Sequence, residues 1–199
     1  MTADLDVSRE TMDRLRAFEQ IVKKWTPKIN LVSRDSAYDI WGRHIADSVQ
    51  LFEAVSPDRH TWVDLGSGGG FPGVVVAILA HGSDTEVTMV ESDGRKCAFL
   101  RAALRETGVD ATVLNQRIEQ VEPQNADVVS ARALADLTTL LGYAERHLTQ
   151  GGTAVFAKGA MWPQEVEAAR SQWNFDLEAV KSKLVPEAAI LKISGVSRV

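Results

Sequence analysis

The chain is 199 residues long, 45% of them hydrophobic and 25% charged, with a formal net charge of -5. The length allows one domain with a modest extension and excludes two ordinary domains, and the negative charge argues against broad, nonspecific adhesion to nucleic acid. A single cysteine, Cys97, excludes an intrachain disulfide, and the scattered histidines predict no metal site. We find no signal peptide and no membrane-length apolar run, so we expect a cytoplasmic protein without a membrane partner.

Two helices are predicted before the first strand. Ser8 can cap the first, which has apolar residues at spacings of three and four up to Trp25 and is expected to end at Pro27. The second is predicted over residues 36–55, with Arg43 and His44 one turn before an Asp-Ser pair, so that all four are expected near one end of a groove. Basic side chains crowd this first quarter and form either a local RNA-binding face or a solvated helix surface.

Residues 62–73 are the most informative stretch, because they predict a buried strand, a glycine loop and a helix in succession. Gly66, Gly68 and Gly70 can adopt positive φ and approach a ligand without a Cβ in the way. Pro72 suits the first turn of the helix, whose free amides then face the ligand. The stretch therefore predicts a nucleotide site.

Two cofactors fit this loop. Gly68-x-Gly70-x-x-Gly73 matches a dinucleotide fingerprint, whereas the same glycines read from Asp64 match the first motif of S-adenosylmethionine-dependent methyltransferases. Glu91 is expected to bind the ribose diol of either cofactor. Asp64 favours S-adenosylmethionine, because an acid beside the glycines suits the methionine ammonium group and repels a pyrophosphate. A nicotinamide-dependent oxidoreductase stays open as the alternative.

The rest of the chain alternates strands with helices, which dictates a doubly wound, mostly parallel sheet. After the first strand, strands are predicted over residues 86–91, 111–114, 126–130, 153–158, 176–183 and 188–193, and helices over 94–106, 134–147 and 163–173, with a turn at 151–152. The last two strands are joined by a short loop and must be antiparallel neighbours, an ending that favours a methyltransferase. The ligand crevice lies outside the carboxyl ends of the strands, where we expect Gly66, Glu91, Ile118, Glu119 and Arg132.

Several motifs between residues 25 and 159 are more specific than the glycines. They are Arg43-His44-Ile45-x-Asp47-Ser48, the Phe-Pro-Gly ending of the glycine loop, Arg117-Ile118-Glu119, Ser130-Ala-Arg-Ala133 and Lys158-Gly159. Together they resemble the bacterial 16S ribosomal RNA guanine-N7 methyltransferase family, once called glucose-inhibited division protein B. Thr26 departs from the asparagine that is usual in that family.

The resemblance implies a Rossmann-like class I methyltransferase with a seven-stranded, mostly parallel sheet, an antiparallel terminal strand and an N-terminal helical extension. We expect a single domain over residues 1–199, with the extension at 1–57 and the core at 58–199. The implied reaction transfers a methyl group from S-adenosylmethionine to N7 of one guanine in a decoding-region loop of 16S ribosomal RNA. The implied partner is that RNA, the small ribosomal subunit or its precursor, and we expect a monomer.

Site residues follow from the loop and from the resemblance. The expected cofactor contacts are Gly66, Gly68, Gly70, Phe71, Glu91, Ile118, Glu119 and Arg132. The expected RNA contacts are Arg43, His44, Arg95, Lys96 and Lys158.

Arg132 is also the expected catalytic residue. We expect its guanidinium to donate two hydrogen bonds to the methionine carboxylate or to guanine O6 and N7. Guanine N7 carries no proton at neutral pH, so the reaction needs positioning and no general base. A noncatalytic RNA-binding protein with the same fold is the third alternative.

Overall fold

The structure is a computed structural model that describes residues 5–33, 38–55 and 60–199. Its sheet consists of β1 (Thr61–Leu65), β2 (Glu86–Glu91), β3 (Thr112–Asn115), β4 (Ala126–Arg132), β5 (Leu148–Lys158), β6 (Trp173–Lys181) and β7 (Ala189–Arg198). The spatial order is β3-β2-β1-β4-β5-β7-β6, and β7 pairs antiparallel with both of its neighbours. The predicted seven-stranded, mostly parallel sheet with an antiparallel strand at its end is confirmed.

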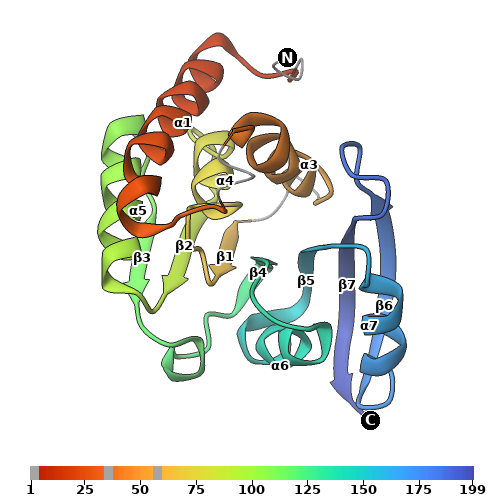
Figure 1. Cartoon of the computed structure of the whole chain (residues 1–199). Coiled ribbons are helices and arrows are strands. Elements are labelled where there is room, and N and C mark those ends of the chain that lie inside the picture. The colour runs from red at the N-terminus through yellow and green to blue at the C-terminus, as the bar shows by residue number, and fades with distance from the viewer. Residues whose placement is uncertain (1–4, 34–37, 56–59) are drawn as a thin grey trace.

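Helices cover both faces of this sheet (Figure 1). They are α1 (Arg9–Ile29), a π-helical turn η1 (Trp41–Ile45) that continues into α3 (Ala46–Glu53), α4 (Gly73–Leu79), α5 (Gly94–Thr107), a 3-10 turn η2 (Ile118–Gln120), α6 (Leu137–His147) and α7 (Trp162–Ala169). One core lies between the sheet and α1, α3, α4 and α5, and a second lies under α6 and α7. Within the described ranges, no helix is long and apolar enough to cross a membrane.

The first strand shows why both faces of the sheet need cover. Trp62 points into the core under α3 and α4, while Val63 and Leu65 point into the core under α6. Successive side chains of a strand alternate between faces, so a continuous apolar run must be buried on both sides. This confirms the buried parallel strand that the sequence predicts.

The first helix begins as predicted and ends later than predicted. The Ser8 side chain accepts a hydrogen bond from the Thr11 amide at 3.1 Å, which confirms the N-cap. The expected end at Pro27 is wrong, because α1 continues to Ile29. A proline in the last turn forfeits only its own amide bond, and the next bond, from the Asn30 amide to the Thr26 carbonyl, is present at 3.0 Å. The helix ends where Asn30 adopts a left-handed conformation.

The second predicted helix contains a feature that its sequence pattern does not signal. Its predicted start at residue 36 lies outside the described residues, and so does the boundary expected at residue 57. Residues 41–45 form a π-helical turn, and regular α-helix begins at Ala46 and ends at Glu53. The wider turn still buries Trp41 and Ile45.

Three predictions in the second half of the chain are wrong in detail. Residues 151–152 are not a turn between elements; they lie within β5, at a register shift in which Ala126 pairs with Leu148 and Val128 with Thr153. The helix expected from residue 134 begins after an Asp136 N-cap, and the helix expected to reach residue 173 ends at Ala169. Trp173 instead begins β6, because its side chain, only 2% exposed, is buried in the core under α6.

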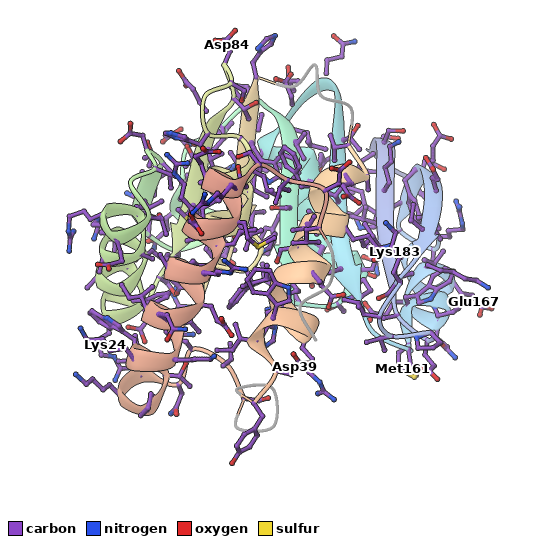
Figure 2. All side chains as sticks on the ribbon, turned by 90° about the horizontal axis from the view of Figure 1, so that it is seen from above. Lys24, Asp39, Asp84, Met161, Glu167 and Lys183 are labelled. Atoms are coloured by element: carbon purple, nitrogen blue, oxygen red, sulfur yellow. The ribbon has the colours of Figure 1, made fainter. Side chains whose placement is uncertain are left out.

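Gln50 joins the N-terminal helices to the C-terminal hairpin. Its side-chain amide donates to the Lys181 carbonyl at 2.8 Å and accepts from the Lys183 amide at 3.0 Å, and it is only 6% exposed. Lys183, which marks the hairpin connection in Figure 2, also pairs with Glu53 at 3.4 Å. We call this contact between α3 and residues 181–183 the Gln50 clasp.

Candidate functional site

The glycine loop connects β1 to α4 with the backbone that the sequence predicts. Gly66, Gly68 and Gly70 have φ values of +65°, +51° and +82°, which confirms the predicted positive φ. The Gly66 amide donates to the Val90 carbonyl at 2.8 Å, which holds the loop against the end of β2. A Cβ at Gly66 would lie 2.6 Å from a methyl carbon of Leu134, so a larger residue there would displace that side chain as well as strain the backbone.

Asp64 precedes the glycines and is completely buried. Its two carboxylate oxygens accept from the Ser130 hydroxyl at 2.8 Å and from the Gly73 amide at 3.2 Å. These bonds tie β1 to β4 and to the start of α4. Asp64 therefore faces the core, and the expectation that it meets a methionine ammonium group is not supported by its position. Burial raises the pKa of Asp64 to about 6.

This raised pKa predicts a pH-dependent stability. Since the folded protein binds the Asp64 proton more tightly than the unfolded chain, the wild-type protein should lose stability as pH rises from about 4 to about 6. The loss should amount to about 3 kcal/mol. An Asp64→Asn protein cannot ionise there and should lack this loss. Urea unfolding of both proteins across this pH range measures it, and parallel pH profiles would contradict the assignment.

The carboxyl ends of the central strands enclose a cleft of about 300 Å³, which we call the cofactor cleft. Four of the predicted cofactor contacts lie together in its wall, namely Gly66, Glu91, Ile118 and Glu119. The sequence analysis missed several other wall residues, among them Ala133, Leu134 and Tyr143. Ala133 was within reach, because it belongs to the Ser-Ala-Arg-Ala turn, whereas Tyr143 lies on a helix without a local signal.

Glu91 organises one side of the cofactor cleft. Its carboxylate accepts from the Gly68 amide at 2.9 Å and from the Asp93 amide at 2.8 Å, so it links the glycine loop to the start of α5. Each carboxylate oxygen has a second acceptor position. Glu91 can therefore accept two hydroxyl hydrogen bonds from a ribose diol and keep both amides.

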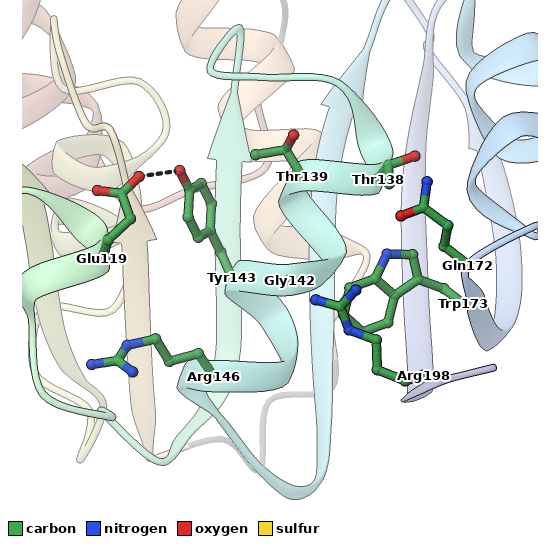
Figure 3. Close-up of a pocket in the computed structure, with 9 residues that line it drawn as sticks. All are labelled: Glu119, Thr138, Thr139, Gly142, Tyr143, Arg146, Gln172, Trp173 and Arg198. Carbon is green, nitrogen blue, oxygen red and sulfur yellow. Dashed lines mark hydrogen bonds between the residues drawn. The ribbon is translucent and has the colours of Figure 1, made fainter.

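Glu119 and Tyr143 form the opposite side. The Tyr143 hydroxyl donates to the Glu119 carboxylate, a bond that raises the pKa of Tyr143 to about 12 and lowers that of Glu119 (Figure 3). The same two residues also line an outer groove of about 380 Å³, where the Arg198 guanidinium lies 4.0 Å from the Trp173 ring centroid.

Arg132 lies in a second cavity, of about 360 Å³, which we call the Arg132 cavity. Ala133 lines both this cavity and the cofactor cleft, so the two spaces lie next to each other at the residue that follows β4. Ala133 has a φ of +52°, a conformation that an L-residue rarely adopts and that is common at functional sites. Arg132 does not line the cofactor cleft, so its contact with the cofactor stays a prediction.

His44 is the nearest partner of Arg132. Its Nδ1 lies 2.6 Å from the Arg132 Nη1, and the Arg43 carbonyl accepts from the same nitrogen at 3.3 Å. Burial and the Arg132 charge lower the pKa of His44 to about 3, so the ring is neutral and Nδ1 accepts. Of the Arg43-His44 and Asp47-Ser48 motif, Asp47 lines the Arg132 cavity, while His44 and the Arg43 carbonyl contact Arg132 in its wall.

Phe71 is buried under this pair. Only 4% of it is exposed, and its ring packs on Phe18 and on the His44 ring, with centroid distances of 5.1 and 4.9 Å. The Arg132 guanidinium lies 5.3 Å from the Phe71 ring centroid. Phe71 therefore supports Arg132 from the core side, and a contact between Phe71 and the cofactor stays a prediction.

The predicted RNA contacts do not form one patch. Arg95 is exposed and pairs with Asp93 at 2.9 Å, and Lys96 lines the cofactor cleft. Lys158 lines the Arg132 cavity and pairs with Glu165 at 2.6 Å. Their contacts with RNA stay predictions. Among the described residues, no group of three acidic, histidine or cysteine side chains is placed to hold a metal ion.

Solved structures with the same fold include methyltransferases. A TehB-like S-adenosylmethionine-dependent methyltransferase from Corynebacterium glutamicum aligns with a TM-score of 0.60 at 19% identity, over 90% of this chain and 98% of that chain. A predicted O-methyltransferase from Agrobacterium tumefaciens aligns with a TM-score of 0.59, also at 19% identity, over 74% of this chain and 79% of that chain. At this identity the likeness establishes the fold.

Sequence relatives are much closer. A protein of a Ruegeria species, named ribosomal RNA small subunit methyltransferase G, is 58% identical over 98% of this chain and 96% of its own length. The protein of the same name from Rhodospirillum centenum is 50% identical over 98% of this chain and 89% of its own length. The family model described as rRNA small subunit methyltransferase G matches residues 11–190. The chain therefore belongs to the GidB family of methyltransferases, as its motifs predicted.

Proposed function

We propose that this chain transfers a methyl group from S-adenosylmethionine to N7 of a guanine in a decoding-region loop of 16S ribosomal RNA. One observation carries the proposal. The cofactor cleft and the Arg132 cavity share Ala133 in their walls, in a chain that matches an rRNA methyltransferase family over residues 11–190. The two spaces provide one place for a methyl donor and an adjacent place for its acceptor. Membership of this family leaves the oxidoreductase alternative without support.

The wall of the cofactor cleft fits S-adenosylmethionine. Gly66 lines the cleft without a Cβ, which leaves room for a ligand beside the loop backbone. Glu91 has acceptor positions for a ribose diol. Ile118, 9% exposed, offers an apolar surface for an adenine ring. When bound, the cofactor supplies an electrophilic methyl group on a sulfonium. Arg132, which the sequence analysis assigns to the methionine carboxylate or to guanine, lies within reach of the junction at Ala133.

The chain itself has little proton chemistry to perform. Guanine N7 carries an in-plane lone pair, so the protein must orient that lone pair towards the methyl group and exclude water. His44 is neutral and holds Arg132 in place, which leaves the remaining guanidinium donors for a ligand. A base in a loop or single strand offers N7 directly, whereas an A-form helix hides it in a deep groove.

The test is methyl transfer from radiolabelled S-adenosylmethionine to small ribosomal subunits that lack the modification. The labelled nucleoside is then identified by chromatography and mass, and we expect 7-methylguanosine. Label in another nucleoside would contradict the assignment of the acceptor atom. Intact cofactor binding without any label would contradict transfer to this RNA and favour the binding-only alternative.

We also propose that the chain acts as a monomer in the cytoplasm, where ribosomal subunits are assembled. Among the described residues, the exposed large apolar side chains Tyr38, Met161 and Val199 lie far apart in the sequence, and Leu184 and Val185 form the one adjacent pair. Light scattering after size exclusion should give the mass of one chain.

A further inference from the structure

The Arg132 cavity is large enough for a nucleobase and has walls from several parts of the fold, α7 with Glu165 among them. Asp47 comes from α3, Arg132 from the end of β4, Lys158 from the end of β5, and Ser182 and Val185 from the connection between β6 and β7. Its remaining lining includes Ala157, Ala188, Ala189 and Ile190. An apolar cavity with a few convergent polar groups is typical of a small-ligand site.

The charged groups of this cavity are not equivalent. Lys158 and Glu165 bind each other at 2.6 Å, and they also bind backbone groups, the Ala135 carbonyl and the Leu137 amide, each at 2.8 Å. That pair is largely satisfied within the protein.

Asp47 differs from this pair. Ser182 lines the same cavity and acts to lower the pKa of Asp47, and a carboxylate has roughly four acceptor positions for donors of a ligand. Asp47 is half-buried, and burial raises its pKa in spite of the nearby Arg132 charge. A half-buried carboxylate of this kind is stabilised by a ligand that brings hydrogen-bond donors.

We propose that the Arg132 cavity receives the target guanine and that Asp47 accepts hydrogen bonds from the N1–H and N2–H groups of its Watson–Crick edge. The inference rests on the proposed function and names the residue that recognises the base. The edge of guanine that carries N7 adjoins its Watson–Crick edge, and the two edges share O6. A guanine that points N7 towards Ala133 therefore presents O6 beside it and N1 and N2 beyond O6, so a wall that contains Ala133, Arg132 and Asp47 can meet all of these groups.

The same pose limits what Arg132 can do. The N7 lone pair must face the methyl group, so Arg132 cannot bind N7 during transfer. Guanine O6 lies between N7 and N1, and Arg132 lines the cavity together with Ala133 and Asp47. Burial lowers the pKa of Arg132, and the charges of nearby Asp47 and Asp64 act in the opposite direction. The Arg132 guanidinium is therefore the donor to O6.

An ionised Asp47 would favour guanine over adenine and would stabilise the positive charge that the purine acquires during transfer. Adenine would present its N1 lone pair to the carboxylate, so a site with Asp47 ionised rejects it. In the reaction the S–CH₃ bond breaks with its electron pair left on sulfur, and the N7–CH₃ bond forms from the N7 lone pair. Positive charge moves from the sulfonium to the purine, where the Asp47 carboxylate stabilises it.

The Gln50 clasp holds this recognition group in place. Gln50 lies three residues after Asp47 on α3, and it binds the backbone on both sides of Ser182. Gln50 thereby fixes the position of Ser182 relative to Asp47.

The experiment compares Asp47→Asn with wild-type protein on unmodified small subunits. Asparagine keeps the size of the side chain but presents an amide donor to the guanine donors. We expect kcat/KM to fall on the order of 10- to 100-fold, with the dissociation constant of S-adenosylmethionine and the melting temperature unchanged. Asp47→Glu keeps the carboxylate and should retain more activity than Asp47→Asn. Asp84→Asn, in an exposed loop far from the cavity, is the matched control and should behave like wild type (Figure 2).

Each outcome decides the matter. Wild-type rates in Asp47→Asn would overturn the inference, and so would a loss of rate in Asp47→Glu as large as that in Asp47→Asn. A lower melting temperature or weaker cofactor binding in Asp47→Asn would assign Asp47 to the fold and likewise overturn it. A wild-type protein that fails to label guanine would contradict the proposed function itself.

Discussion

Replacing Arg132 with alanine should lower kcat/KM for methyl transfer on the order of 100- to 1,000-fold, while the protein stays folded. The substitution removes the guanidinium from the cavity wall and leaves the backbone pairing of Arg132 with Ala157 in the sheet. Rates with radiolabelled cofactor and the melting temperature together measure the effect. Full activity in Arg132→Ala would remove this residue from the mechanism.

The dissociation constant of S-adenosylmethionine separates the two roles expected of Arg132. If Arg132 binds guanine O6, the alanine protein should bind the cofactor with nearly wild-type affinity. A large loss of affinity would instead assign Arg132 to the methionine carboxylate. Arg105→Ala, at an exposed position on α5, is the control for loss of an arginine charge and should change neither quantity.

Replacing Glu91 with alanine should raise the dissociation constant of S-adenosylmethionine on the order of 10- to 100-fold, as measured by calorimetry. Two effects contribute. The ribose diol loses its carboxylate acceptor, and the Gly68 and Asp93 amides lose the group that holds the loop to α5.

Glu91→Gln separates these effects, because glutamine keeps one acceptor oxygen and should lose less affinity than alanine. Glu86→Ala, at the exposed beginning of the same strand, should bind the cofactor normally. Wild-type affinity in Glu91→Ala would contradict the assignment of the cofactor cleft.

Local patterns were sufficient for the cofactor side of the site. The glycine loop, the acid at the end of β2 and the turn after β3 are each encoded within a few residues, and parallel strands bring their carboxyl ends to one edge. Gly66, Glu91, Ile118 and Glu119 were therefore placed together from sequence alone, and the structure brings them together in one cleft.

The other side of the site depends on contacts that no local pattern contains. His44 reaches Arg132 across 88 residues, and Gln50 reaches the Lys181 carbonyl across 131 residues. Sequence reasoning gave the Arg43-His44 motif the role of an RNA contact. The structure shows His44 as the acceptor partner of Arg132, because only the packing of α3 over the strand ends brings the two together.

Errors in the element boundaries have related causes. The π-helical turn at Trp41–Ile45 keeps the apolar residues buried, so their spacing alone does not reveal it. Trp173 fits an amphipathic helix as well as a buried strand, and the tertiary core under α6 decides for the strand.

The two cavities of the site are built from different lengths of the chain, and the Gln50 clasp attaches the last segment of the second cavity to α3. Every residue that lines the cofactor cleft has been synthesised by residue 143, whereas the Arg132 cavity also needs residues 182–190. All the residues that line the methyl-donor cleft are thus synthesised before the last residues of the acceptor cavity. The cavity proposed to bind the target base is complete only after the C-terminal hairpin has been synthesised and has docked on α3.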